Sequence, residues 1–449
     1  MCSGGVALLK AIMAAALLFL AAACAQAPDL TGVEASFASG TAGAGATRTD
    51  GALAQSAFGR QITQAVHTSP SLARSSARIR AAEAETDAAR GAFRPQLSVG
   101  ANARTNRLDN NVATVSPYLR ISQLVYDGGA ATGDLTAARA RVLESRGDQL
   151  QIAAATTLEA IEAYVMVLNQ RKLLEIARRN VETHETLERQ ISTRTTSGAG
   201  SNADLLAAQS RMADARTLAA DARARLDRAE ARFREIFSAA PVGTLPTPQP
   251  APPLTRSDGE IVADSPQVRR ASASLKAAEA ELAAAIARRN PSLIAGVIGN
   301  QDRDRDAHFE ADLALNFDLD TTGQRRAAIK AAEARVEEAV YERERLTREI
   351  GRELGFIRSD QKAGAERLRA ARIAASANAD SVDAAFEQFT VGRRSLIEIL
   401  DAQRDYVIAQ ESLILAEQNF FLTNYAALSL TGDILDVFGI SLTGWEAPS

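Results

Sequence analysis

Two short stretches of the chain place an acidic side chain three residues after a serine. They are Ser201 with Asp204, and Ser395 with Glu398. At the start of a helix, such a serine accepts a hydrogen bond from a backbone N–H, and the acid accepts one from the serine N–H. Aspartate is a weaker version of the glutamate or glutamine that usually fills this role. The chemistry predicted for these residues is therefore helix capping by carboxylates.

Residue types that carry catalysis are scattered. The three histidines, His67, His184 and His308, lie far apart in the sequence and are expected on the surface. The two cysteines, Cys2 and Cys24, lie near the N-terminus, and the sequence contains neither a phosphate-binding loop nor a metal-ligand cluster. We therefore expect a protein that is not an enzyme and that uses no metal or cofactor. The net charge of −4 also gives no reason to expect nucleic-acid binding.

The elements that would position the two serine–acid pairs occur twice. Pro70–Pro95 and Pro266–Pro291 share one pattern at a displacement of 196 residues, and both contain Ala-Ala-Glu-Ala-Glu. Further along, Gly198 and Gly392 head equivalent turns 194 residues apart. This period is too long for a solenoid, whose repeats span about 20 to 50 residues. We therefore predict a duplicated chain, with repeats at 57–240 and 259–432, a linker at 241–258 and a C-terminal segment at 433–449.

Proline placement indicates long helices. Six of the 13 prolines lie within 241–253, whereas none lies between Pro117 and Pro241 or between Pro291 and Pro448. Because proline costs about 3 kcal/mol inside a helix, these gaps permit very long helices. Ala, Leu, Glu, Arg and Gln dominate there and favour helix. The predicted helices are 57–91, 130–195, 202–236, 262–288, 325–388 and 396–430, the longest reaching about 100 Å and packing through alanine seams.

Four stretches alternate apolar and polar residues and predict strands at 96–103, 115–126, 292–301 and 309–318. Their lengths match the roughly 9 to 11 residues with which a tilted strand crosses an outer membrane. Four strands cannot close a barrel, and an open edge is not tolerated in lipid. Several chains would have to complete the barrel together. The alternative is a small soluble sheet that caps a helical rod.

The N-terminus favours export. Residues 1–23 carry a lone Lys10 before the apolar run Ala11–Ala23, as in a signal peptide, and Cys24 follows directly. We predict lipidation of Cys24, the alternative being an ordinary secreted chain. Residues 24–56 are rich in small and polar side chains and are expected to form a flexible tether.

The order of signal, helix, strand, strand, long helix, glycine turn and helix, given twice, resembles the TolC family of outer-membrane efflux and secretion channels. The sharpest match is Phe389–Gln403, which is similar to the turn and returning helix of the family's second hairpin. Gln123–Gly129 resembles the joint between strand and helix, and Asp318–Gly323 departs from that pattern. The resemblance implies a mainly α fold with a small β part. Duplicated helical hairpins would form a periplasmic tunnel, and four transmembrane strands per chain would join a trimeric 12-stranded β-barrel.

The resemblance also implies a gate at the tunnel mouth. Family members close the mouth with carboxylates at the positions of Glu398 and Asp401, helped by contacts between residues at Arg394 and Asp204. In a homotrimer these acids would form a ring around the axis that attracts cations and titrates as a coupled set. Capping or surface charge alone is the competing explanation.

The expected partners follow from the same resemblance. A periplasmic adaptor would dock at the turns, at Gly198 and at Val391, Gly392 and Arg393. An inner-membrane ABC exporter or proton-driven pump would supply energy to this passive conduit, whose barrel contacts outer-membrane lipid. Tyr425–Gly439 looks similar to members that serve type I protein secretion. A periplasmic adaptor or a coiled-coil scaffold protein remains the alternative function.

Overall fold

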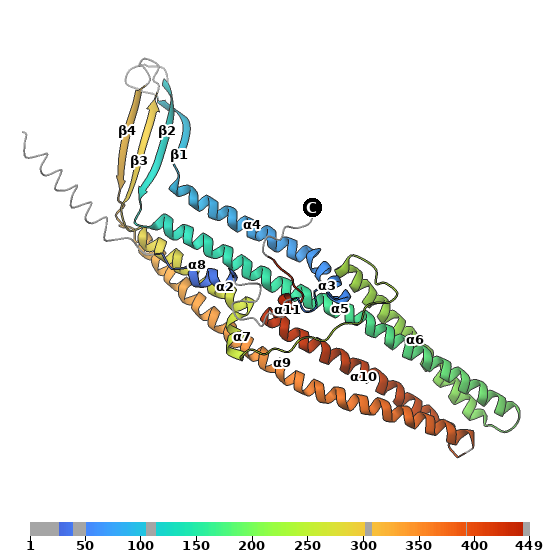
Figure 1. The fold of residues 1–449 in the computed structure, drawn as a ribbon. Helices are drawn as coiled ribbons and strands as arrows, with labels where there is room; N and C mark the ends of the chain where they lie inside the picture. The colour runs from blue at the N-terminus through green and yellow to red at the C-terminus, as the bar shows by residue number, and fades with distance from the viewer. Residues whose placement is uncertain (1–26, 39–50, 105–113, 301–307, 392, 443–449) are drawn as a thin grey trace, which may run out of the picture. The chain divides into compact units, whose positions relative to one another are not determined.

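The computed structural model describes residues 27–38, 51–104, 114–300, 308–391 and 393–442 (Figure 1). Contacts divide the chain into two compact units. The first takes in the N-terminal residues up to Ala38 with Ser75–Asp148 and Gln267–Thr347, and the second takes in the remainder. The helices α5 (Ala130–Thr196) and α9 (Gln324–Thr390) each contribute residues to both units.

The predicted duplication is visible in the lengths of the helices. Helices α5 and α9 each contain 67 residues. The helices that return from them, α6 (Asn202–Phe237) and α10 (Leu396–Thr431), each contain 36 residues. The predicted ranges of all four agree with the structure to within a few residues, because long proline-free segments of strong helix formers leave little choice of conformation.

The two shorter predicted helices are wrong in one respect, because each is broken by a proline. The range 57–91 contains α3 (Ala57–His67) and α4 (Pro70–Arg90), followed by the short 3-10 turn η1 (Gly91–Phe93). The range 262–288 contains the end of α7 (Asp258–Asp264) and all of α8 (Pro266–Ala287). Pro70 and Pro266 have no N–H to donate, so each starts a new helix at its first position instead of continuing the previous one.

Parts of the predicted tether and tail are ordered. Helix α2 (Thr31–Ala38) lies within the segment expected to be flexible. Leu53 is buried, and its N–H donates to the carbonyl of Val437 at 3.1 Å. The C-terminal segment folds as α11 (Asp433–Val437), whose apolar side chains are buried. These segments fold because apolar residues among the small ones reach the core. The predicted signal peptide, 1–23, lies outside the described residues.

The proline-rich linker contains neither helix nor strand and is tied to the helices of the second unit. Tyr164 Oη donates to the carbonyl of Pro246 at 2.8 Å, and Tyr425 Oη donates to that of Gln249 at 2.7 Å. Arg171 donates to two further carbonyls, those of Val242 and Gly243. The linker therefore has a defined course although it has no secondary structure of its own.

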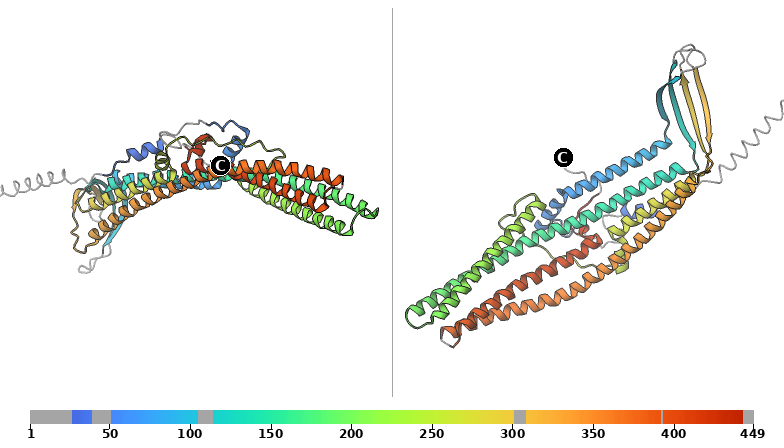
Figure 2. Two further views of the ribbon diagram at one scale, coloured as in Figure 1. Left: turned by 90° about the horizontal axis from the view of Figure 1, so that it is seen from below. Right: turned by 180° about the vertical axis from the view of Figure 1, so that it is seen from behind.

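The strands β1 (Gln96–Arg104), β2 (Thr114–Tyr126), β3 (Ser292–Asn300) and β4 (His308–Asn316) form one antiparallel sheet in chain order (Figures 1 and 2). The two halves of the duplication meet in the middle of this sheet. Ile121 on β2 lies opposite Leu97 on β1 and Val297 on β3. All four predicted strands are thus confirmed, and β1 and β4 are the two edges.

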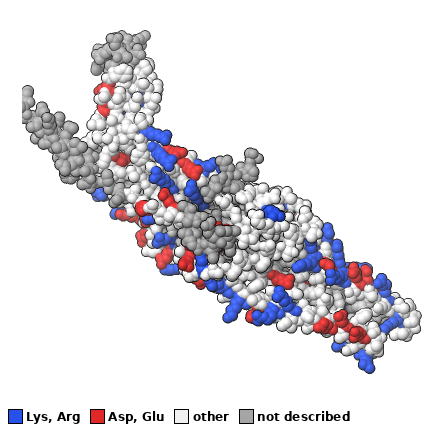
Figure 3. All heavy atoms as spheres, in the orientation of Figure 1, with Lys and Arg blue, Asp and Glu red and all other residues white. Residues whose placement is uncertain are grey.

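The two faces of the sheet differ in polarity. One face exposes large apolar side chains, among them Phe309 at 78% and Leu313 at 65% exposure. The other carries Arg120, Glu310 and Asp312, which alternate with those residues along the strands. Figure 3 shows few charged groups on the visible side of the sheet, whereas both signs of charge cover the helices. An apolar face of this extent is expected to contact lipid or another protein.

Small residues let the helices approach closely, as predicted. In the first unit a Cβ on Gly133 of α5 would come within 2.8 Å of the Ala284 Cβ and 2.9 Å of the Ala284 nitrogen of α8. No residue larger than glycine fits there without moving the helices apart.

The most apolar 18-residue window of α5 has a mean hydropathy of 1.3, enough by composition to cross a membrane, but 61% of it is buried. That window belongs to the helical core.

Candidate functional site

The first hairpin turns at Gly198, directly after α5. The Gly198 N–H donates to the carbonyl of Thr195 at 3.1 Å, and the Ala199 N–H donates to that of Arg194 at 2.9 Å. This pair of bonds is a Schellman motif, which needs a left-handed residue at its turn. Gly198 has a φ of 76° and supplies that conformation at no steric cost.

The predicted capping box at the start of α6 is wrong. Ser201 caps the helix, but its hydroxyl accepts from the N–H of Ala203 at 3.1 Å. Asp204 is half-buried in the first turn, and the structure shows no return bond from it to Ser201. We attribute this to the shorter aspartate side chain, which has one methylene fewer than glutamate with which to reach the N–H of the cap.

The capping box at the start of α10 is confirmed. The N–H and the hydroxyl of Ser395 both lie 2.8 Å from the same carboxylate oxygen of Glu398. The Ser395 N–H, then its hydroxyl and then nearby Arg394 hold the pKa of Glu398 below its ordinary value of 4.5. Glu398 therefore remains ionised at a lower pH than a free glutamate. Its side chain is also exposed, so this charge faces solvent in the single chain.

Arginines accompany both predicted gate carboxylates. Arg404 lies 3.3 Å from Asp401, three residues away on α10, and Arg394 lies 4.0 Å from Glu398. Exposed pairs of this kind contribute about 0 to 1 kcal/mol, so they shape the local charge more than the stability. Arg404 was not among the predicted site residues. Its spacing of three residues from an acid on a predicted helix is the signal that identifies it.

Two further predicted site residues lie at the second turn. Val391 and Arg393 are exposed, and the Arg393 N–H donates to the carbonyl of Gln388 at 2.8 Å. Gly392, and likewise Cys24, lies outside the described residues. Within the described chain no ion pair joins Arg394 to Asp204. A contact between these two residues in neighbouring copies therefore stays a prediction.

A shared core holds the ends of the two hairpins together. It contains residues of α5, α6, α9 and α10, namely Leu187, Ile191, Ala208, Ala385, Phe389, Leu396, Ile399 and Leu400. The hairpins lie side by side in both ribbon figures. Arg194 of α5 also lies over the ring of Phe389 of α9, a contact between hairpins that sequence reasoning did not identify. The glycine turns and the carboxylates of α10 are thus presented by one packed body.

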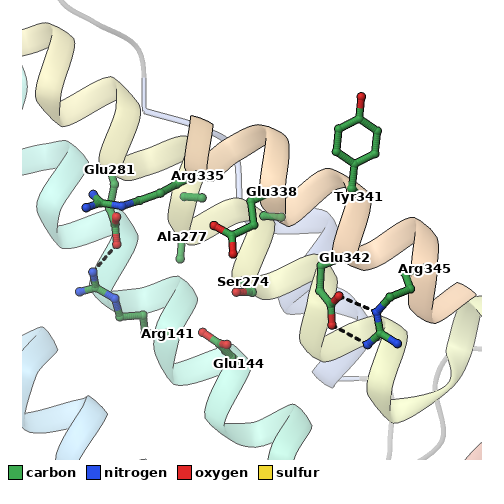
Figure 4. A pocket seen from close by; sticks show the side chains of 12 residues that line it. Arg141, Glu144, Ser274, Ala277, Glu281, Arg335, Glu338, Tyr341, Glu342 and Arg345 are labelled. Carbon is green, nitrogen blue, oxygen red and sulfur yellow. Dashed lines mark hydrogen bonds and ion pairs between the residues drawn. The ribbon is translucent and has the colours of Figure 1, made fainter. Parts of the chain in front are cut away.

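The first unit contains a groove of about 830 Å³ between α5, α8 and α9 (Figure 4). Its charges largely neutralise one another, because Arg141 pairs with Glu281, and Arg345 pairs with Glu342 at 2.7 Å. Burial raises the pKa of Glu144 in the same groove. Among the described residues, no three His, Cys, Asp or Glu side chains are placed to hold a metal ion. The carboxylates of α10 remain the candidate site, and their negative charge attracts cations.

Comparison with known proteins agrees with this architecture. The model of the family described as outer membrane efflux protein matches residues 61–238 and 259–431, one match for each half. The outer membrane efflux protein BepC of Brucella suis is 24% identical over 417 residues, which cover 88% of this chain and 89% of BepC. No single stretch of sequence carries the match, because it spans nearly the whole of both proteins.

Solved structures share the fold. A membrane protein from Pseudomonas aeruginosa superposes with a TM-score of 0.76 at 19% identity, covering 85% of this chain and 94% of that one. The open-state MtrE outer membrane channel of Neisseria gonorrhoeae gives a TM-score of 0.75 at 16% identity, with 87% and 91% covered. The predicted resemblance to TolC-type channels is thereby confirmed. The chain belongs to the outer membrane efflux protein family and is an outer-membrane export duct whose long helices extend into the periplasm.

Proposed function

We propose that three copies of this chain form a passive exit duct for a tripartite export system. The observation that carries the proposal is the four-stranded sheet, which has an exposed apolar face and two edges, β1 and β4. Edges that enter lipid must be paired, so each β4 would pair with β1 of the next copy. Three sheets would close a 12-stranded barrel with its apolar face toward lipid and its polar face toward the lumen.

Exposed apolar residues on α9 support assembly as well. Tyr341, Phe356 and Ile373 are each at least 60% exposed, which is unusual for large apolar side chains on a water-soluble helix. In a closed ring of helices these side chains would be covered by the next copy. Each copy would then contact the next through two different surfaces, and a three-fold rotation would close the assembly into a ring instead of an open filament.

At the periplasmic end, we propose that Glu398 and Asp401 line the constriction of the closed duct. They start α10, which the shared core holds against the first hairpin. Three copies would bring their carboxylates around one axis, with Arg394 and Asp204 placed for contacts between copies. The duct would open when α10 of each copy moves outward. Arg394 and Arg404, which pair with these acids, would make the ring less negative than unpaired carboxylates would.

We propose that a periplasmic adaptor docks on the turns, at Gly198 and at Val391, Gly392 and Arg393. A photo-crosslinking residue at Arg393 is expected to capture the adaptor in cells and to identify the ABC exporter or proton-driven pump that it serves. The same residue at Arg228 of α6 is the control, because it lies about 39 Å along the helix from that hairpin's turn. Equal capture at both positions would contradict docking at the tips.

We also propose that Cys24 carries a lipid anchor. Leu30, six residues later, is buried against Ala140 of α5 and Ala277 of α8. Ala140 lies about 15 Å along α5 from its start next to the sheet. Six extended residues reach about 20 Å, so the docked segment would leave Cys24 within reach of the membrane surface. Mass spectrometry should find an acylated N-terminal cysteine that Cys24→Ser removes, and an unmodified cysteine would contradict the proposal.

Fractionation and electrophoresis test the proposed assembly. The protein should occur in the outer-membrane fraction and migrate as a trimer without heating and as a monomer after boiling. A periplasmic adaptor or scaffold would fractionate elsewhere, and its migration would not depend on heat. A monomer in unheated outer membranes would contradict the three-copy barrel.

A further inference from the structure

Helix α5 carries polar side chains in positions that an apolar seam would normally fill. Asn180 and His184 are only 7% and 6% exposed, although histidines without sequence partners were expected on the surface. Asn169, further from the turn, is equally buried. Leu187 and Ile191 continue the same buried stripe toward the turn. The expectation of a surface histidine is therefore wrong for His184, because helical spacing places it on the core face of α5.

The buried amides connect the two hairpins. Gln403 Nε2 of α10 donates to Asn180 Oδ1 of α5 at 3.3 Å, and Asn169 Nδ2 donates to Gln418 Oε1 at 3.0 Å. Amide pairs in a helical seam fix its register but contribute less stability than apolar residues of similar size. These hydrogen bonds also persist only while water is excluded from both amides, since water offers each amide an alternative partner. These contacts are consequently suited to a seam that opens.

His184 lies one helical turn from Asn180, on the side nearer the tip. Its Nδ1 has no hydrogen-bond partner among the described residues. Burial, with a further contribution from Arg211, lowers the pKa of His184, and Asp214 opposes this. The imidazole is therefore neutral at pH 7, and a proton would place an unsolvated charge in the seam.

The groups near His184 and those near Asn180 come from different helices. Helix α6 contributes Arg211 and Asp214, which form an ion pair with each other at 3.8 Å. Beside Asn180, a cavity of about 550 Å³ is lined by Asp383, Glu387 and Phe386 of α9 and by Gln403, Tyr406 and Val407 of α10. Among the charged groups of the described chain, Arg211 and Asp214 of α6 are the ones that shift the pKa of His184. The cavity gives water a route to the amide pair when the hairpins part.

We propose that His184 and the Asn180–Gln403 pair form an acid-sensitive latch between the two hairpins, which opens when His184 takes up a proton. The effect at the gate rests on the proposed function, because release of the latch frees α10, the helix that carries Glu398 and Asp401. The latch itself is a property of the seam and does not depend on that function.

The direction of the effect follows from linkage. When the seam is parted, His184 is hydrated and regains its ordinary pKa of about 6.5, whereas in the closed seam its pKa is lower. The parted seam therefore binds more protons, and the closed seam loses stability as the pH falls below about 6.5. The closed seam loses no further stability once the pH is below the lowered pKa of His184 as well. Neutral pH favours the closed latch.

Hydrogen–deuterium exchange of the purified protein tests the latch without relying on transport. After correction for the intrinsic pH dependence of exchange, amides of α5 near residues 180–191 should exchange several-fold faster at pH 5.0 than at pH 7.5. His184→Gln, which cannot take up a proton in this range, should remove the difference. His67→Gln is the matched control, since burial lowers the pKa of His67 too but it lies at the end of α3. It should keep the difference.

Unchanged protection of α5 between the two pH values, or an equal difference in His184→Gln, would overturn the latch. If His184→Gln fails to fold, His184→Leu provides the second test, because leucine cannot take up a proton either and should keep α5 protected at pH 5.0. Single-channel conductance separately tests the link between the latch and the gate. An acid-dependent change in exchange without a change in conductance would refute the link to the gate and leave the latch standing.

Discussion

The guanidinium carbon of Arg194 lies 4.7 Å from the centroid of the Phe389 ring. Arg194 belongs to the last turn of α5 and Phe389 to the last turn of α9, so this contact joins the two hairpins next to their glycine turns. The ring is buried in the shared core, whereas the arginine is exposed. A cation over an aromatic face at such a site contributes about 0.5 to 1 kcal/mol.

Loss of this contact should loosen the tips without unfolding the hairpins. Arg194→Ala is expected to speed limited proteolysis at the turn after α5 by a few-fold, in line with about 0.5 to 1 kcal/mol of lost interaction. Arg178→Ala is the control, since Arg178 is exposed on the same helix and its described neighbours include no ion-pair partner. Equal cleavage rates in both variants would show that the contact does not restrain the tips.

The capping box of α10 should control the titration of Glu398. Ser395→Ala removes the hydroxyl donor and is expected to cost about 1 kcal/mol of helix stability. The pKa of Glu398 should rise toward 4.5, because the carboxylate loses a hydrogen bond that favours its charged form. In the wild type, the stabilisation by ionised Glu398 is fully present above the ordinary glutamate pKa of 4.5. It is lost as the pH falls through the lowered pKa of Glu398.

Carbon-13 NMR of labelled glutamate measures this titration directly. Ser201→Ala is the matched control, because it removes the equivalent serine from the first hairpin, where no capping box forms. It should leave the titration of Glu398 unchanged. A Ser395→Ala variant whose Glu398 titrates as in the wild type would show that the hydroxyl has no influence on this charge.

The two faces of the sheet should respond differently to charge. Leu313→Arg places a cation on the apolar face and is expected to cost about 2 to 4 kcal/mol if that face meets lipid near the bilayer centre. Asp312→Asn, on the neighbouring polar-face position, should cost much less. The yield of heat-modifiable trimer in outer membranes measures both. Equal yields would indicate that the apolar face does not contact lipid.

Local pattern was sufficient to predict most of the fold. The strands alternate apolar and polar residues over much of their length, and the long helices lack proline. Both patterns can be recognised without knowing which elements pack together. The helix breaks at Pro70 and Pro266 could also have been predicted from the sequence, because each proline follows a serine and has no N–H to continue the previous helix. Burial of Leu53 and of α11 was not predictable, because single apolar residues in a polar segment reveal their role only when the tertiary contacts are known.

The candidate site divides in the same way. The capping residues Ser395 and Glu398 are close in sequence, and their interaction was predictable. Asn180 and Gln403 are 223 residues apart, and Arg194 and Phe389 also belong to different hairpins. Their contacts depend on how two helices are rotated against each other, which a small shift in the alanine-rich seam would change. The need for several copies can be inferred from one chain, but the residues that pair between copies cannot.

Single-channel conductance in planar bilayers tests the central claim most directly, namely that the carboxylates of α10 constrict a trimeric duct. The double variant Glu398→Ala and Asp401→Ala should conduct several-fold more than the wild type at neutral pH and should lose preference for cations. Glu366→Ala, an exposed acid farther along α9, is the control and should conduct like the wild type. A double variant with wild-type conductance and cation preference would contradict the account.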